Sequence, residues 1–294
     1  MKLSVCIPVY NFDVRELVFD LKNEIIDKKI DAEIILIDYA SDASFNTVNK
    51  ELQNDVKDFV FLKKNLGRSK IRNLFLEYAE GDYLLFLDCD AKIDSKNFLS
   101  TYLEEITQND EVEVVYGNFR VSPVYAHSLR NRYSIEREIF SGIRSADFSV
   151  FKTVNFIIQK ETFQKFPFDE ELLHYGYEDY IFAKRMQLAN VRFSAINNPV
   201  IHVDGTENAI FLEKTETAIR SLYQLSQNPE NLPYIQDLKV FCVAQKLKKK
   251  RLSNGYLFFY NLIEKKLVKN LLSDHPYLKS LDLYKLGLLL RRMR

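Results

Sequence analysis

The sequence predicts an α/β protein, with a sheet flanked by helices and followed by a helical C-terminal region. Between residues 3 and 107, short apolar runs that stop at polar residues alternate with segments of helical hydrophobic period. Such alternation favours parallel strands with helices on both faces of the sheet. From residue 206 onward every apolar pattern has the helical period. We therefore expect a first domain over residues 1–205 and a helical region over residues 206–294.

The first part of the chain contains four apolar runs of strand length and three amphipathic segments. Each apolar run is bounded by polar residues, which is typical of a buried strand that reaches the edge of its sheet. Gly81 follows the third amphipathic segment, and we expect it to cap that helix. The predicted strands are 3–9, 32–38, 59–62 and 83–87, and the predicted helices are 14–25, 44–54 and 69–80.

The second part of the chain is less regular. Residues 120–150 are polar and aromatic, and we expect them to form a connection over the site rather than a regular element. Residues 197–205 have the pattern of a loop. The remaining predicted strands are 112–119, 154–159 and 191–196, and the predicted helices are 95–107, 178–189, 209–225, 235–250, 254–272 and 277–293.

The composition is that of an ordinary globular protein, with 47% hydrophobic and 28% charged residues. The N-terminus does not have the pattern of a signal peptide, and no apolar window reaches the roughly 18 residues of a membrane span. Three cysteines without metal-ligand spacing indicate reduced thiols. We therefore expect a cytoplasmic protein.

The net charge is zero, but the charges are unevenly distributed. Residues 239–294 contain fourteen Lys or Arg and three acidic residues. Basic amphipathic helices in this tail, with KLKKKR and a terminal RRMR, favour peripheral contact with the inner face of the plasma membrane over binding to nucleic acid. The alternative is a helical subdomain that packs on the body of the protein or on a second chain, as in a homodimer.

The stretch YLLFLDCD, residues 83–90, is the strongest local signal for a site. Asp88 and Asp90 follow a predicted buried strand, and the carboxyl end of such a strand is where an open α/β sheet binds ligands. On an extended backbone the two side chains point to the same side. Two close carboxylates raise each other's pKa unless a cation lies between them. The pattern predicts a divalent metal site that receives a phosphorylated ligand; the alternative is a strand followed by an acidic turn.

Three further polar clusters fall at strand ends or just beyond them. The first strand leads into Tyr10 and Asn11, and the second ends at Asp38. The segment NLGRSKIRN, residues 65–73, opens a helix whose amides and basic side chains favour an anion. Taken together with Asp88 and Asp90, and in chain order, the clusters indicate an acid for a base or ribose, cations for a phosphate, and a metal site. Neither a G-x-G-x-x-G motif nor a P-loop motif occurs.

Together these stretches resemble a known family. LSVCIPVYN, EIILIDYASDAS and NLGRSKIRNLFLEYAEGDYLLFLDCDAKI are similar in order and spacing to the first half of the family 2 glycosyltransferases. The resemblance covers about residues 3–205 and implies a GT-A fold, a Rossmann-like mixed sheet flanked by helices. One departure is that the family often has paired acids at the end of the second strand. Here the second position is Tyr39, which could instead stack on the base.

Two later stretches add residue roles by resemblance. YGYEDYIFAKRM resembles the Glu-Asp motif of inverting members, which implies Asp179 as the catalytic base and Glu178 as a contact of the donor sugar. PVIHVDG is similar to a segment whose histidine, here His202, completes the metal site. The alternatives are acids that complement a helix dipole and a hydrogen-bonded loop histidine. The implied ligands of Mn²⁺ or Mg²⁺ are Asp90, His202 and Asp88, and the implied nucleotide-sugar site is Pro8, Val9, Tyr10, Asp38, Asn65, Arg68, Arg72 and Asp88.

The resemblance implies an inverting, metal-dependent glycosyltransferase of the hexosyltransferase type. It would transfer a sugar from a nucleoside diphosphate, such as UDP, to a hydroxyl of a glycan or lipid-linked glycan, in the synthesis of bacterial cell-surface polysaccharide or lipopolysaccharide. Residues 1–116 would bind the nucleotide, and residues 117–205 would hold the acceptor and the base. The alternatives are an inactive nucleotide-sugar-binding partner subunit and a nucleotidyltransferase, whose glycine-rich basic signature is missing after the first strand.

Overall fold

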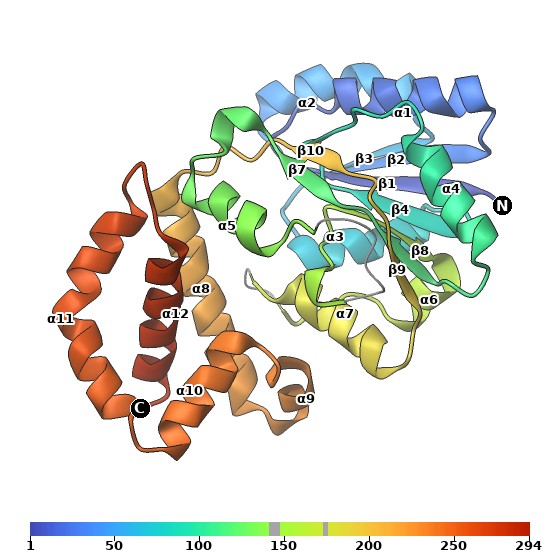
Figure 1. Ribbon diagram of the computed structural model, residues 1–294. Helices are drawn as coiled ribbons and strands as arrows, with labels where there is room; N and C mark the ends of the chain where they lie inside the picture. The colour runs from blue at the N-terminus through green and yellow to red at the C-terminus, as the bar shows by residue number, and fades with distance from the viewer. Residues whose placement is uncertain (141–147, 173–175) are drawn as a thin grey trace. The chain divides into compact units, whose positions relative to one another are not determined.

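The computed structural model describes residues 1–140, 148–172 and 176–294 (Figure 1). The chain divides into two compact units, unit 1 with two apolar cores and unit 2 with one. Unit 1 comprises residues 1–122, 138–173 and 182–203, and unit 2 comprises residues 123–137, 174–181 and 204–294.

Unit 1 is built on a seven-stranded sheet. In sheet order the strands are β3 (Asp58–Leu62), β2 (Ala32–Tyr39), β1 (Leu3–Val9), β4 (Tyr83–Leu87), β8 (Asn155–Gln159), β6 (Val114–Tyr116) and β9 (Phe193–Ala195). The first four are parallel, whereas β8 runs antiparallel to both β4 and β6. β6 and β9 are parallel. The sheet is therefore mixed, which confirms the predicted fold class.

The side chains of β4 alternate between two apolar cores, one on each face of the sheet. Leu85 and Leu87 pack in the first core, and Leu84 and Phe86 in the second. All four are fully buried, as expected of a central strand with helices on both faces (Figure 1). The helices of the first core are α1 (Arg15–Lys28) and α4 (Phe98–Gln108), and those of the second are α3 (Arg68–Leu74), α6 (Lys160–Lys165) and α7 (Glu178–Leu188).

A second sheet of three short strands completes unit 1. Its strands, in sheet order, are β5 (Ala91–Lys92), β10 (Val200–His202) and β7 (Phe119–Val121). The segment 197–205 was expected to be a loop, but it contains β10, so His202 lies on a strand. The hydrophobic pattern misses β10 because three residues are too few to show a period of two.

The predicted strand 112–119 is wrong as a single element. β6 ends at Tyr116 and belongs to the large sheet, whereas β7 begins at Phe119 and belongs to the small one. The chain leaves the large sheet at Gly117, where a Cβ atom would lie 2.3 Å from Nδ2 of Asn155 and 2.4 Å from the hydroxyl oxygen of Tyr102. A residue with a side chain would collide with both groups.

The predicted helix 69–80 is also shorter than expected. α3 ends at Leu74, a 3₁₀ turn η2 (Phe75–Glu77) follows, and Gly81 does not cap the helix. Gly81 instead lies against β1, where an added Cβ atom would be 2.6 Å from the backbone nitrogen of Ser4. Its own N–H donates to Oγ of Ser4 at 2.8 Å. A glycine is therefore needed just before β4, because the backbone there passes too close to Ser4 to leave room for a side chain.

The predicted helix 44–54 consists of α2 (Ala43–Asn49) and a 3₁₀ turn, η1 (Lys50–Asn54).

The segment 120–150 has more regular structure than its composition predicted. Residues 141–147 of this segment lie outside the described residues. The remainder contains the end of β7, two 3₁₀ turns and one helix, which are η3 (Pro123–Tyr125), η4 (Phe148–Val150) and α5 (Leu129–Arg137).

Unit 2 is helical. α5 and the helices after residue 204 surround one apolar core. The expected C-terminal helices are confirmed, and a short one is added between the first two. None of the described helices combines the length and the apolar character that a membrane crossing requires. These helices are α8 (Asn208–Gln227), α9 (Leu232–Ile235) after the 3₁₀ turn η5 (Pro229–Asn231), α10 (Lys239–Lys249), α11 (Ser253–Leu271) and α12 (Leu278–Arg292).

A glycine lets α11 and α12 approach each other closely. An added Cβ atom on Gly287 of α12 would lie 2.3 Å from a ring carbon of Tyr260 on α11. Tyr260 is almost fully buried, and its hydroxyl donates to Oε1 of Glu264 at 3.0 Å. Arg291 spans the same pair of helices, since it forms an ion pair with Glu264 at 2.8 Å and lies over the Tyr260 ring.

We expect Gly287→Ala to destabilise the protein by roughly 1–3 kcal/mol, because the new methyl group overpacks the contact with Tyr260. Gly255→Ala is the matched control, since Gly255 lies on α11 with nothing within 4 Å of an added Cβ atom. That change should be neutral or stabilise by up to about 1 kcal/mol through helix propensity. Urea denaturation followed by circular dichroism measures both. Equal stability of the two variants would contradict the packing argument.

Candidate functional site

Asp88 and Asp90 lie in a tight turn at the end of β4. The backbone N–H of Asp88 donates to the carbonyl of Val154 at 3.1 Å, and the N–H of Ala91 donates back to the carbonyl of Asp88 at 3.1 Å. The strand therefore ends at Leu87, and the turn, not the parity of an extended backbone, sets the directions of the two carboxylates.

Asp88, Asp90 and His202 form a cluster that has the donor set of a metal site. One ligand atom from each residue lies within 4.8 Å of the others, and Nε2 of His202 is 3.2 Å from Oδ2 of Asp90. His202 reaches the cluster because β10 pairs with β5, which follows the Asp88–Asp90 turn directly. In that pairing His202 lies opposite Ala91, and the N–H of Val203 donates to the carbonyl of Asp90 at 2.9 Å.

The residues of this cluster fit a divalent cation. Oδ1 of Asp90 is buried, and within residues 1–140, 148–172 and 176–294 it has no hydrogen-bond partner. A buried carboxylate oxygen without a partner is unfavourable unless a cation or donor binds there. Carboxylate oxygens suit Mg²⁺ or Mn²⁺, and one imidazole nitrogen favours Mn²⁺ of the two.

Arg72 compensates the charge of Asp88. Its Nη2 is 2.9 Å from Oδ1 of Asp88, and its guanidinium lies 5.5 Å from the ring centre of Phe168. Arg72 is only 3% exposed, so this cation is held in place by packing as well as by charge. Burial raises the pKa of the Asp88 carboxyl group, the Arg72 guanidinium lowers it, and the Asp90 carboxylate raises it again. The second oxygen of Asp88 remains available to the cluster.

The loop before α3 brings basic groups to the same edge of the sheet. Oδ1 of Asn65 accepts a hydrogen bond from the N–H of Gly67 at 2.8 Å, and Gly67 has a φ of 83°. α3 then begins at Arg68, whose side chain is exposed and whose charge lowers the pKa of Asp88. The carbonyl of Arg68 accepts from Nη1 of Arg72 at 3.3 Å. Arg68 and Arg72 therefore place two positive charges near the carboxylates.

Asp38 lies at the end of β2, fully buried. Its Oδ1 accepts from the N–H of Ser41 at 2.9 Å, while its Oδ2 has no hydrogen-bond partner in the described part of the chain. In the strand register Asp38 pairs with Val9, and Pro8 pairs with the preceding residue of β2. The first and second strands therefore deliver these residues to one edge, with a buried acceptor ready for an N–H or O–H group.

Two tyrosines lie beside Asp38. The rings of Tyr10 and Tyr39 stack with their centres 5.1 Å apart, and Tyr10 is 42% exposed. Burial raises the pKa of Tyr39 to about 12, so its phenol is neutral at neutral pH. Asn11 links the loop after β1 to the loop after β2, because its N–H donates to Oγ of Ser41 and its Oδ1 accepts from the N–H of Asp42. The rings of Tyr10 and Tyr39 therefore offer an aromatic surface next to the buried carboxylate of Asp38.

Glu178 and Asp179 belong to unit 2 and lie in the first turn of α7. Oε2 of Glu178 accepts from the N–H of Gly176 at 2.8 Å, and Glu178 is 6% exposed. Tyr177, which lies between Gly176 and Glu178, has a φ of 71°, which is strained for a residue with a side chain. Acids at this position also complement the helix dipole. The two acids are not members of the cluster of Asp88, Asp90 and His202.

The sequence did not single out the buried polar residues that hold β10 in place. The hydroxyl of Tyr102 donates to Oδ1 of Asn155 at 2.6 Å. Nδ2 of Asn155 donates to the carbonyls of Asn118 and Asn198, at 3.1 and 2.8 Å. Asn155 thus ties β8 to the segments that precede β7 and β10. The sequence signal that could have identified Asn155 is its position as a polar residue at the start of the apolar run NFIIQ.

Comparison with known proteins identifies the family. The family model "Glycosyl transferase family 2" matches residues 4–173, more than half of the chain. The chain belongs to glycosyl transferase family 2. A poly(ribitol-phosphate) beta-glucosyltransferase of Bacillus spizizenii is 28% identical over 125 residues, which is 41% of this chain. The chain spans only 19% of the length of that relative and 22% of the length of a Rickettsia conorii glycosyltransferase.

Solved structures share the GT-A glycosyltransferase fold with this member of family 2. A mannosyltransferase from Pyrobaculum calidifontis, in complex with GDP-Man and Mn²⁺, matches with a TM-score of 0.59 at 13% identity, over 99% of this chain and 86% of that one. TarS of S. aureus, in complex with UDP, matches with a TM-score of 0.59 at 20% identity, over 99% and 89%.

We expect Arg72→Met to destabilise the protein at neutral pH by roughly 1–3 kcal/mol, because Asp88 loses its compensating charge. Burial already raises the folded-state pKa of Asp88, and losing Arg72 raises it further. At a pH between the unfolded-state and folded-state pKa values of Asp88, the folded variant keeps a proton on this carboxyl group that the unfolded chain releases. The loss of stability should therefore grow as pH rises from acidic to neutral. It should vanish at a pH low enough for Asp88 to be protonated in both states.

Urea denaturation across this pH range measures the effect. Arg192→Met is the matched control, since Arg192 is half exposed and pairs with Glu111 on the surface. Asp88→Asn in the Arg72→Met background should recover stability at neutral pH. A loss of stability that is the same at every pH would show that the charge of Asp88 is not the cause.

Proposed function

We propose that this family 2 glycosyltransferase is an inverting enzyme that transfers a sugar from a nucleoside diphosphate, with UDP the expected carrier, to an acceptor hydroxyl. The cluster of Asp88, Asp90 and His202 beside the buried Arg72 is the observation that supports this most. Solved relatives of the same fold bind UDP, or GDP-Man with Mn²⁺, which agrees with such a donor.

The donor's nucleoside would occupy the edge formed by the first two strands. Asp38 offers a buried acceptor to a base or ribose, and the Tyr10–Tyr39 pair offers an aromatic surface for stacking. The diphosphate would lie toward Asn65, Arg68 and Arg72, where the positive charges are. The full donor site that we propose is Pro8, Val9, Tyr10, Asp38, Asn65, Arg68, Arg72 and Asp88.

A divalent cation would be held by Asp90, His202 and Asp88. When bound, Mn²⁺ or Mg²⁺ supplies positive charge that neutralises the charge developing on a leaving diphosphate. The protein's own part is to keep these three side chains together through the Asp88–Asp90 turn and the pairing of β10 with β5. Arg72 contributes a second positive charge that is present with or without the ion.

Asp179 is our candidate for the general base, which takes the proton of the acceptor hydroxyl as the bond to the sugar forms. Its side chain is half-buried and lies at a helix N-terminus, next to the more buried Glu178. We assign Glu178 to the donor sugar. A base on the face opposite the leaving group implies inversion at the anomeric carbon. In this scheme residues 1–116 bind the nucleotide and residues 117–205 provide the base and the acceptor site.

The acceptor that we propose is a hydroxyl of a glycan or a lipid-linked glycan in bacterial cell-surface polysaccharide synthesis. The support is the relative from Bacillus spizizenii, which is a poly(ribitol-phosphate) beta-glucosyltransferase, and a second one named minor teichoic acid biosynthesis protein GgaB. The first name describes a transferase that acts on poly(ribitol-phosphate), and the second a protein of teichoic acid biosynthesis. The acceptor is the part of the proposal that rests on similarity alone.

We expect Mn²⁺ to raise the midpoint of thermal unfolding of the wild-type chain, since binding to the folded state alone stabilises it by about 2.7 kcal/mol at 100 times the dissociation constant. Asp90→Asn should abolish this shift, because it replaces a carboxylate ligand by a neutral amide. Asp94→Asn is the control, since Asp94 pairs with Arg120 outside the cluster. A full shift in the Asp90 variant would remove that residue from the metal site.

We expect a panel of nucleotide sugars to reveal one donor whose nucleoside diphosphate is released by the wild-type chain. Asp179→Asn should slow this release by about 10²–10⁴, which is the usual contribution of a general base. Glu161→Gln is the control, because Glu161 is an exposed acid in the first turn of α6. Circular dichroism checks folding. A variant at Asp179 with wild-type turnover would contradict its assignment as the base.

A further inference from the structure

α11 exposes a row of large apolar side chains. Phe258, Phe259 and Leu262 are 63%, 66% and 64% exposed, and they lie within about one helical turn of one another. The opposite face of α11 is occupied, because Leu257 and Tyr260 are buried in the core of unit 2. The packing of α12 against Tyr260 shows that the exposed row is not the face that unit 2 uses for its own core. We call Phe258, Phe259 and Leu262 the apolar row.

Positive charges continue the same face. Lys265, Lys266 and Lys269 follow Phe258, Phe259 and Leu262 at a spacing of seven residues, so they lie on the same side of the helix about two turns further on. All three lysines are exposed. The one acidic residue of α11, Glu264, is directed to Arg291 and Tyr260 instead. The exposed face of α11 therefore combines apolar and cationic side chains without a negative charge.

More cations precede α11. The last turn of α10 carries Lys246, Lys248 and Lys249, and Lys250 and Arg251 lie in the connection to α11. Leu252, 54% exposed, adds one apolar side chain to the start of the row. The apolar row is thus bounded by basic groups at both ends along the chain, which is the distribution found where a helix rests on an anionic lipid surface.

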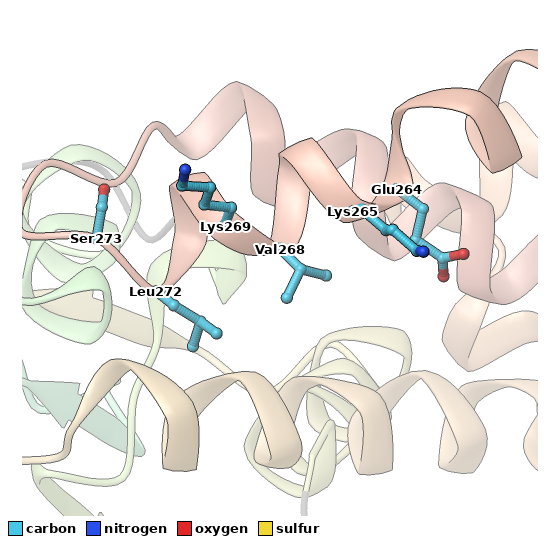
Figure 2. A pocket seen from close by; sticks show the side chains of 6 residues that line it. All are labelled: Glu264, Lys265, Val268, Lys269, Leu272 and Ser273. Carbon is cyan, nitrogen blue, oxygen red and sulfur yellow. The ribbon is translucent and has the colours of Figure 1, made fainter.

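A hollow with a volume of about 710 Å³ lies beside the C-terminal half of α11. Figure 2 shows that Val268 and Leu272 point to the same side of this segment, while Lys269 points to the other. The lining is completed by Glu264, Lys265 and Ser273, and most of its surface is apolar. The apolar side chains of this hollow therefore lie on a different side of α11 from Lys269.

We propose that the face of α11 formed by the apolar row and Lys265, Lys266 and Lys269 docks on the surface of an anionic lipid bilayer. The apolar side chains enter the boundary between headgroups and acyl chains, and the lysines remain at the level of the phosphates. A second copy of this chain is a poorer occupant, because the same face would bring these like charges together. The proposal is independent of the glycosyl-transfer assignment, since docking requires neither donor nor acceptor.

Vesicle sedimentation of the full chain, without nucleotide sugar, tests this proposal. The probes are vesicles of equal amounts of phosphatidylglycerol and phosphatidylcholine, and vesicles of phosphatidylcholine alone. We expect binding to the anionic vesicles that weakens as salt is raised, and at least tenfold weaker binding to the neutral ones.

Phe259→Ser/Leu262→Ser should weaken binding to the anionic vesicles by at least about tenfold, because two inserted side chains are lost. Phe19→Ser/Ile26→Ser is the matched control: it also removes one Phe and one aliphatic residue, and these are 63% and 66% exposed on α1 of unit 1. The control should bind as the wild-type chain does. Lys265→Gln/Lys266→Gln/Lys269→Gln should remove most of the salt dependence.

Four results would overturn the proposal. They are the absence of wild-type binding, equal binding to the two kinds of vesicle, wild-type binding by the α11 variant, and an equal loss in the α1 control. If the wild-type chain does not bind vesicles but elutes from a sizing column as a dimer that Phe259→Ser/Leu262→Ser dissociates, a second copy is the occupant. The thermal midpoints of all variants are measured first, and substitutions at such exposed positions should leave them nearly unchanged.

Discussion

The ion pair between Arg72 and Asp88 compensates a carboxylate that burial would otherwise drive toward its neutral form. The guanidinium is itself buried and lies over the ring of Phe168, so it cannot move away from Asp88 without exposing apolar surface. Of the two neighbouring acids, Asp88 and Asp90, the first is thereby balanced by a charge of the protein itself. The other, Asp90, keeps a buried oxygen without a hydrogen-bond partner among the described residues and lies next to His202. The carboxylate of Asp90 and the second oxygen of Asp88 therefore remain for a cation.

The rest of unit 1 holds this arrangement in place. β10 brings His202 to Asp90 through pairing with β5, and Asn155 ties the segments before β7 and β10 to the large sheet. These contacts are hydrogen bonds between buried groups, which are unfavourable to break because the freed groups would lack partners. A histidine on a short strand, supported in this way, is better oriented than one on a loop. The scaffold therefore pre-orients all three members of the cluster.

Unit 2 shows how one amphipathic helix can have two uses. The buried face of α11 meets α12 at Gly287, where the helices approach closely enough to exclude a side chain. The other face presents large apolar groups to solvent, followed by lysines. Single exposed apolar residues are common on protein surfaces, whereas a row of them on one helical turn is not. The row, rather than the overall basic charge of the tail, therefore distinguishes α11 from an ordinary solvated helix.

The sequence alone determined the α/β class, the strands that end near Asp38 and Asp88, and the helices of the C-terminal region. These features follow from local hydrophobic period, and parallel strands bring their carboxyl ends to one edge of the sheet. Only the tertiary structure showed that residues 112–119 divide between two sheets, that Gly81 lies against Ser4, and that His202 stands on a strand beside Asp90. Each depends on contacts between segments distant in the chain. A pattern of neighbouring residues cannot record such contacts, because it carries no information on which distant segment fills the adjoining space.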